Sequence, residues 1–406
     1  MSFNIALSGL NAASNDLDVT SNNIANANTT GFKSSRAEFG DVFAQAANNL
    51  SNSLIGSGVK LESVAQNFGQ GNVNFTNNTL DLAISGSGFF TLSNNGSIEY
   101  SRAGAFGPDN QGFVVNSSGQ RLQVYPASPV TGVIDTGRLS DLQLSTANNP
   151  PSATTTISAG VNLQASATPP TLTPFDPTDP NTYNSTSSLT VFDSLGASHT
   201  TNLFFTKTAT PNEWTVQTRV DGADVGGPQI LTYDGNGVLI SPANGRVTLP
   251  AVTLANGATP LNMTLDLSGS TQFGDQYAVA SLQQNGFATG RLSGLSVSSS
   301  GVVQANFTNG QSKPLGQVAL SNFTNAQGLQ QLGDTKWSES FSSGQPIRGA
   351  AGAGAFGNIQ SGALEASNVD ISKELVNLIT AQRNYQANAQ SIQAESTITQ
   401  TILQVR

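Results

Sequence analysis

The stretch NIANANTTGFKSSR, Asn23–Arg36, marks the point where a helical pattern gives way to a β-rich one. Upstream of it, apolar and small residues recur in alternating steps of four and three. That spacing is typical of a coiled-coil seam. We therefore predict an N-terminal helix that packs on another helix through its apolar seam positions, which are Phe3, Leu7, Leu10, Leu17 and Ile24.

The stretch itself has the composition of a helix end followed by a turn. Asn26 offers a side chain for backbone groups that are freed where the helix ends. Gly31 permits a backbone conformation that a β-branched residue would resist. We expect Phe32 to anchor the departing chain in an apolar groove, while Lys33 and Arg36 stay hydrated.

The C-terminal segment repeats the rhythm of the first helix, and Asn368 or Asp370 could cap it. Both seams contain polar and small residues, so we expect each end to be weakly ordered alone and to become helical against neighbouring copies. The alternative is that both helices pack on the chain's own core. The predicted seam contacts of the second helix are Ile371, Leu375, Leu378, Tyr385, Ile392 and Leu403.

The middle of the chain has the pattern of short strands joined by glycine-containing turns. SLTVFDSLGASHTTNLFF and ILTYDGNGVLI both read as hairpins. Such strands at short intervals favour sandwiches or barrels. The predicted fold is therefore mainly β with terminal α-helices, in which the two helices pair as a coiled-coil-like axial domain and two β-rich barrel or sandwich domains are nested between them.

Two breaks in composition divide the chain. The first contains Pro150 and Pro151, and the second extends from Gly274 to Gly286. Proline fixes the backbone and glycine loosens it, so we predict these four residues as hinges. The predicted domains are an axial helical domain of residues 1–30 and 366–406, connecting segments 31–70 and 350–365, an inner β domain of 71–145 and 285–349, and an outer β domain of 146–284.

Composition excludes several functions. Only 10% of the residues are charged, and the net charge is −9. A typical soluble domain carries about 25% charged residues, and nucleic-acid binding requires basic patches. No apolar run approaches the roughly 18 residues of a membrane span. We also expect no cleaved signal peptide, because no basic region precedes Lys33. We predict a protein that neither binds nucleic acid nor inserts into a membrane.

Catalytic motifs are weak. The DTG at Asp135 lacks the second carboxylate of an aspartic protease. The run Gly352–Gly357 matches a dinucleotide-binding spacing but has neither the strand nor the helix that such a site needs. His199 is the only histidine, and we expect it to face solvent in a turn. We predict no enzyme activity, no metal and no cofactor.

Three segments resemble the rod and hook family of bacterial flagellar axial proteins. The first is SNNIANANTTGFKSSR, with Asn23, Ile24, Asn26, Thr29, Gly31, Phe32 and Lys33 at the family's positions. The second comprises LDLAISGSGFFTL and the following YSRAGAFGPDNQGFVVNSSGQRLQVY, and the third is the C-terminal helix from GALEAS onward. The segment of about 145–284 resembles the outer domain of hook subunits, so we expect the hook branch rather than the distal rod protein.

The resemblance implies a helical tubular polymer outside the cell, which links rod to filament as a flexible joint. Implied partners are further copies of the chain, the distal rod protein, the hook cap scaffold, the hook–filament junction protein and the flagellar type III export apparatus. Within this family we predict that the stretch Asn23–Arg36 joins the axial helix to the outer layers and packs between subunits. The alternative is a routine helix end and loop. A secreted adhesin or carbohydrate-binding protein is the alternative from another class, but it would not need matched helical seams at both ends.

Overall fold

The computed structural model describes residues 2–42, 56–129, 131–145 and 147–404. It divides into two compact units, one of residues 1–146, 294–306 and 312–406, and the other of residues 147–293 and 307–311. Pro150 and Pro151 therefore lie a few residues past one boundary in the sequence, whereas Gly274 and Gly286 lie inside the second unit. The hinge role of these residues and the finer division into domains stay predictions.

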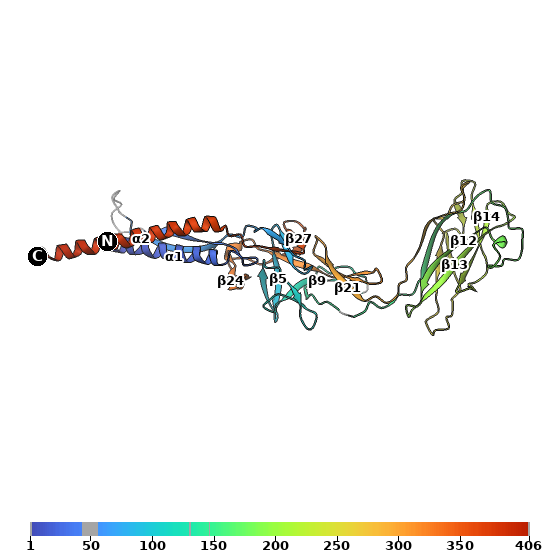
Figure 1. Ribbon diagram of the computed structural model, residues 1–406, viewed down its shortest axis with the longest axis horizontal. Helices are drawn as coiled ribbons and strands as arrows, with labels where there is room; N and C mark the ends of the chain where they lie inside the picture. Colours follow the sequence, from blue (N-terminus) through green and yellow to red (C-terminus); the bar gives the residue numbers. More distant parts are fainter. Residues whose placement is uncertain (1, 43–55, 130, 146, 405–406) are drawn as a thin grey trace. The chain divides into compact units, whose positions relative to one another are not determined.

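The first unit contains both helices, α1 (Ser2–Ala25) and α2 (Ile371–Gln404), which lie side by side and antiparallel (Figure 1). As expected, Asn26 helps to end α1, because its side-chain amide donates to the backbone oxygen of Asn22. Asp370 caps α2 by accepting from the backbone nitrogens of Ser372 and Lys373. Of the two predicted cap residues, Asp370 is therefore the cap. None of the described helices has the length and apolarity needed to cross a bilayer.

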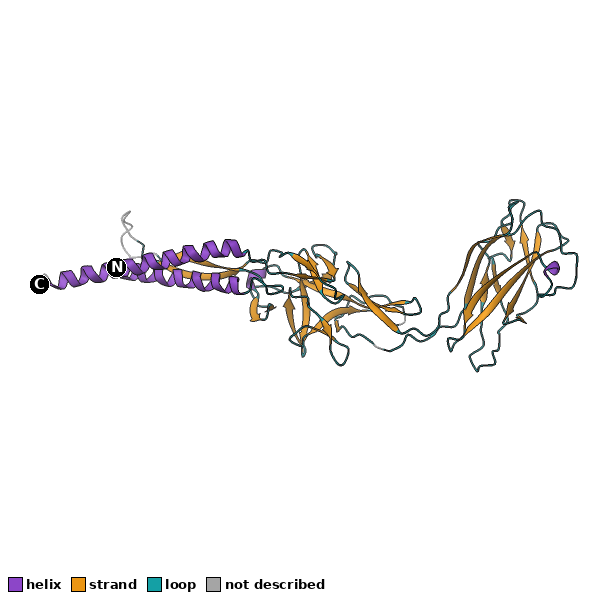
Figure 2. Ribbon diagram, viewed as in Figure 1, coloured by secondary structure: helices purple, strands orange, loops and turns teal. Residues whose placement is uncertain are grey.

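A two-stranded hairpin, a large sheet and two further two-stranded sheets complete the first unit, with the helices beside the hairpin (Figure 2). Its apolar core includes Leu82, Phe90, Leu122 and Leu320. The hairpin is β1 (Ser35–Asp41) and β2 (Val59–Gln66). The other strands are β3 (Val73–Phe75), β4 (Leu82–Ser85), β5 (Phe89–Asn94), β6 (Ser97–Ser101), β7 (Gly107–Pro108), β8 (Val114–Val115), β9 (Arg121–Pro126), β10 (Ser140–Asp141), β21 (Leu292–Val297), β22 (Val302–Phe307), β23 (Ser312–Asn322), β24 (Gln330–Gly333), β25 (Lys336–Ser338), β26 (Ile347–Ala350), β27 (Asn358–Ser361) and β28 (Ala363–Glu365).

The second unit is a β-sandwich. A four-stranded sheet, β18-β19-β11-β20, and a sheet ordered β12-β13-β14-β16-β17 share one apolar core that contains Ile157, Leu265, Leu203 and Trp214. The strands are β11 (Thr156–Asn162), β12 (Ser185–Phe192), β13 (Ser198–Lys207), β14 (Glu213–Val220), β15 (Ala223–Asp224), β16 (Gln229–Tyr233), β17 (Leu239–Ser241), β18 (Arg246–Thr248), β19 (Thr264–Asp266) and β20 (Ala278–Gln284).

The predicted fold class is confirmed, and the choice between sandwich and barrel is settled. The two predicted hairpins are the pairs β12–β13 and β16–β17. Among the described residues no sheet closes into a barrel. Twisted open sheets that cover each other bury the alternate apolar residues without closure.

Candidate assembly interface and its buried junction

A buried ion pair joins the two terminal parts of the chain. The Nζ of Lys33 donates to Oε1 of Glu365 at 2.6 Å, and both side chains are 0% exposed. Burial lowers the pKa of Lys33, whereas the charge and hydrogen bond of Glu365 act to raise it. The expectation that Lys33 stays hydrated is therefore wrong. A carboxylate 332 residues further along the chain replaces water as its partner, and no sequence pattern indicated that pairing.

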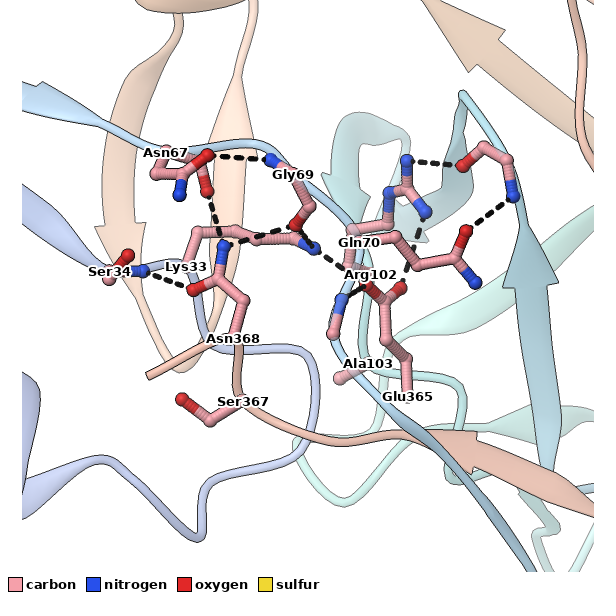
Figure 3. A network of polar contacts seen from close by, with 12 residues as sticks. Lys33, Ser34, Asn67, Gly69, Gln70, Arg102, Ala103, Glu365, Ser367 and Asn368 are labelled. Atoms are coloured by element: carbon pink, nitrogen blue, oxygen red, sulfur yellow. Dashed lines mark hydrogen bonds and ion pairs between the residues drawn. The ribbon is translucent and has the colours of Figure 1, made fainter. Parts of the chain in front are cut away.

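Glu365 is the centre of this junction (Figure 3). Its second oxygen accepts from Nη1 of Arg102 at 3.2 Å, and its first also accepts from the backbone nitrogen of Gly71 at 2.9 Å. Lys33 donates in addition to the backbone oxygen of Gly69. Burial lowers the pKa of Arg102, while Glu365 acts to raise it. One carboxylate thus connects four separate segments of the first unit.

Gly31 occupies a tightly packed point of the junction. Its φ of +70° lies in the left-handed region, as predicted. An added Cβ would lie 2.5 Å from the backbone nitrogen of Ala103. The backbone nitrogen of Gly31 donates to the backbone oxygen of Glu365 at 2.8 Å. Glycine is therefore required here both by backbone conformation and by space.

Two asparagines tie the helices to this junction. Asn23 is buried, exchanges hydrogen bonds with the backbone of Ser35 and donates to Oε2 of Glu374 on α2. Asn368 accepts from the nitrogen of Ser34 and donates to the oxygens of Asn67 and Gly69 (Figure 3). The start of α2 and the end of α1 are consequently fixed to the same group of segments.

The helices pair through small and polar residues. The side-chain amide of Asn388 lies so close to Gly9 that a Cβ added to Gly9 would be 2.6 Å from Oδ1 of Asn388. A second contact joins Asn23 to Glu374. These two contacts are two heptads apart on both helices, so the register is that of a coiled coil. The buried α1 positions are Ala6, Ala13, Thr20 and Asn23, and the fully buried α2 residue is Ala381.

The apolar seams predicted from the sequence are offset by one residue from this register. A shift of one residue turns a side chain by about 100° around the helix, because a turn contains 3.6 residues. The predicted residues consequently flank the intrachain seam. Phe3, Leu7, Ile371, Leu375 and Tyr385 are exposed; Leu10, Leu17, Ile24, Leu378 and Ile392 are half-buried; the side chain of Leu403 lies outside the described residues.

The remaining predicted contact residues lie in or beside the junction. Asn26, Thr29 and Phe32 are half-buried, whereas Gly31 and Lys33 are buried. Whether any of these residues contacts a second chain stays a prediction.

His199 does not lie freely in a turn as expected. It belongs to β13, and its Nδ1 lies 2.6 Å from Oδ2 of Asp221 while its Nε2 lies 3.2 Å from Oδ2 of Asp193. Because both ring nitrogens contact carboxylates, neither is free to accept a proton from a nucleophile in this arrangement. No cluster of three or more His, Cys, Asp or Glu residues suited to a metal occurs in the described part of the chain.

Comparison with known proteins identifies the family. The chain matches the family models "Flagella basal body rod protein" over residues 3–33, "Flagellar hook protein FlgE/F/G D1 domain" over 83–163, "Flagellar basal body protein FlaE D2 domain" over 162–287 and "Flagellar basal body rod FlgEFG protein C-terminal" over 360–405. It is 42% identical to the flagellar hook protein FlgE of Escherichia coli over the full length of both chains. The chain belongs to the flagellar hook protein family.

Other relatives agree with this assignment. The flagellar hook protein FlgE of Salmonella typhimurium is 41% identical, again over the full length of both chains. A solved structure of Helicobacter pylori flagellar hook protein FlgE2 aligns with a TM-score of 0.54 and 14% identity, covering 72% of this chain and all of that one. The hook-family fold is thus shared, and the chain is a hook subunit rather than a rod subunit or an adhesin. The flagellar hook protein family is a family of structural proteins.

Proposed function

We propose that this hook-family chain self-assembles into a helical tube through its terminal helices, and that the tube transmits torque as a flexible joint between rod and filament. The observation that carries this proposal is the offset between the two seams. The helices pair through small residues and leave the apolar seam positions Leu7 and Leu375 exposed, at 40% and 46%.

Exposed apolar heptad positions favour packing by further helices. Apolar side chains in a regular stripe gain roughly 25 cal/mol per Å² when they leave water. A contact between unlike surfaces of identical copies does not close on itself and extends into a helical filament. The buried junction supports this arrangement because it holds the two helices on the rest of the first unit.

The proposal also covers the partners, the route of export and the place where the tube bends. The partners would be further copies of the chain, the distal rod protein, the hook cap scaffold and the hook–filament junction protein, after export without a cleaved signal peptide by the flagellar type III apparatus. Bending would be taken up where the backbone passes between the two compact units, near Pro150 and Pro151. We propose no catalytic step.

Polymerisation of purified protein tests the central claim. Leu375→Glu places a charge in the open seam, so the critical concentration should rise about tenfold, equivalent to about 1.4 kcal/mol. Gln390→Glu makes the same charge at an exposed position of α2 outside both seams and should have little effect. Reactions started from sheared hook fragments remove nucleation as a variable. Equal critical concentrations for both variants and wild type would contradict assembly through this seam.

A further inference from the structure

We propose that the loop between β25 and β26 is a docking knob, and that its Phe341 inserts into a neighbouring copy of this chain in the hook. The proposal rests on the polymer proposed above and adds a contact outside the helices. Phe341 has a relative exposure of 106%, the largest among the exposed large apolar residues of the described chain. A lone exposed leucine is ordinary, but a fully extruded aromatic side chain is a typical anchor of an interface.

The loop is ordered around Phe341 rather than loose. The Oγ of Ser343 accepts from the backbone nitrogen of Ser340, and the Oγ of Ser340 accepts from the nitrogens of Ser342 and Ser343. The side-chain amide of Asn325 donates to the oxygen of Ser342. These bonds fix the backbone on both sides of Phe341, so little further conformational entropy is lost on docking.

Close packing beneath the loop also holds it in place. A Cβ on Gly328 would lie 2.4 Å from the carbonyl carbon of Ser342 and 2.5 Å from the nitrogen of Ser343. Glycine thus lets the segment of Ala326–Gly328 support the loop directly. The monomer gains no burial of Phe341 from this arrangement, since the ring stays wholly exposed.

The surroundings of Phe341 suit an uncharged protein surface. The loop from Glu339 to Pro346 is otherwise Ser, Gly and Gln, and its carboxylate on Glu339 already accepts from the hydroxyl of Tyr100. Ile347, the first residue of β26, is 57% exposed and extends the apolar surface. A partner over the loop would therefore displace water mainly from apolar and neutral groups; the nearby charges are Glu339 and the exposed Arg348, which follows Ile347.

A second copy of the chain is the occupant that fits best. With only 10% of its residues charged, this chain offers its copies the neutral surface that Phe341 requires. The knob is part of the same compact unit as the helices, so one unit would carry both contacts. Insertion of one copy's knob into a different surface of the next is again a heterologous contact and propagates along a filament.

The absence of cysteine from the sequence makes the test direct. Phe341→Cys provides a single thiol, and Ser118→Cys provides a matched thiol in an exposed turn of the same unit. In the monomer both should react freely with a maleimide. In the assembled polymer the thiol at position 341 should react at least about tenfold more slowly than in the monomer, because a buried thiol is shielded from the reagent. The control thiol should stay as reactive as in the monomer.

Two further variants separate contact from presentation. Phe341→Ala should raise the critical concentration about tenfold or more, as for a hot-spot aromatic, with the monomer's melting temperature unchanged. Gly328→Ala keeps the ring but displaces the loop, and should weaken assembly as well. If wild type polymerises, and the thiol of Phe341→Cys reacts as fast in its polymer as in its monomer, the knob is refuted and the proposed function stands. Failure of wild type to extend hook fragments would refute both.

Discussion

At the residue scale, the buried junction concentrates the consequences of single substitutions. Glu365 accepts from both Lys33 and Arg102, and its side chain is inaccessible to water. Removing one partner of a buried ion pair leaves an uncompensated charge that water cannot reach. A neutral side chain at position 365 would leave two such cations together.

We therefore predict that Glu365→Gln destabilises the first unit by about 3–5 kcal/mol. The matched control is Glu38→Gln, which breaks the Arg36–Glu38 pair, whose side chains are 79% and 43% exposed. An exposed pair is screened by water and contributes little to stability. Urea unfolding followed by Trp337 fluorescence, in a background that carries Trp214→Phe, measures both values. Similar losses in the two variants would mean that the junction is not the buried ion-pair centre described above.

A second residue-scale prediction concerns pH. Burial alone would lower the pKa of His199, but its hydrogen bonds to Asp221 and Asp193 outweigh this and raise the pKa above its ordinary value. A folded pKa above the unfolded one contributes stability that is complete below about pH 6.5 and is lost as pH rises through the folded pKa. Hydrogen bonds lower the pKa of Asp193 to about 2 despite its burial, so this carboxylate stays ionised in that range.

We predict that the second unit becomes less stable as the pH is raised from about 5 to about 9, and that His199→Gln removes this slope. Unfolding followed by Trp214 fluorescence, in a background that carries Trp337→Phe, measures it. Asp221→Asn should reduce the slope, because Asp221 provides the first of the contributions that raise the pKa of His199. Parallel curves for wild type and His199→Gln would show that the histidine pair does not contribute.

At the element scale, the two helices show where sequence reasoning succeeds and where it stops. The heptad rhythm predicts both helices and the Asn-rich end of α1, because local spacing and capping determine them. The rhythm locates the most apolar stripe, and the structure pairs α1 and α2 through the adjacent stripe with Ala6, Ala13 and Ala381. Periodicity reports which face is apolar but not which partner covers it. The partner of Lys33, 332 residues away, is beyond any local pattern.

The register itself can be tested by filling the small-residue seam. Ala13 is buried, so Ala13→Leu should overpack the contact with α2 and cost about 1–3 kcal/mol. Asn11→Leu introduces the same side chain at an exposed position of α1 and should change stability by less than about 0.5 kcal/mol. Hydrogen exchange of the α2 amides reports the pairing. Equal exchange in both variants would indicate that the helices do not meet at Ala13.

At the scale of the whole molecule, the two compact units have separate apolar cores, and each contains one of the two tryptophans. Trp214 belongs to the core of the second unit, and Trp337 to an aromatic cluster of the first with Phe89 and Tyr100. Both indoles are almost completely buried. Each tryptophan therefore reports the unfolding of its own unit when the other is replaced by phenylalanine.

A cavity in one core should accordingly leave the other unit's transition in place. Leu265 is fully buried in the core of the second unit, so Leu265→Ala should destabilise that unit by about 2–5 kcal/mol. The shift should appear in Trp214 fluorescence and be absent from Trp337 fluorescence, each recorded in its single-tryptophan background. Equal shifts of both signals would mean that the units unfold as one cooperative body. Independent transitions would instead fit a joint whose rigid units move while each keeps its own core intact.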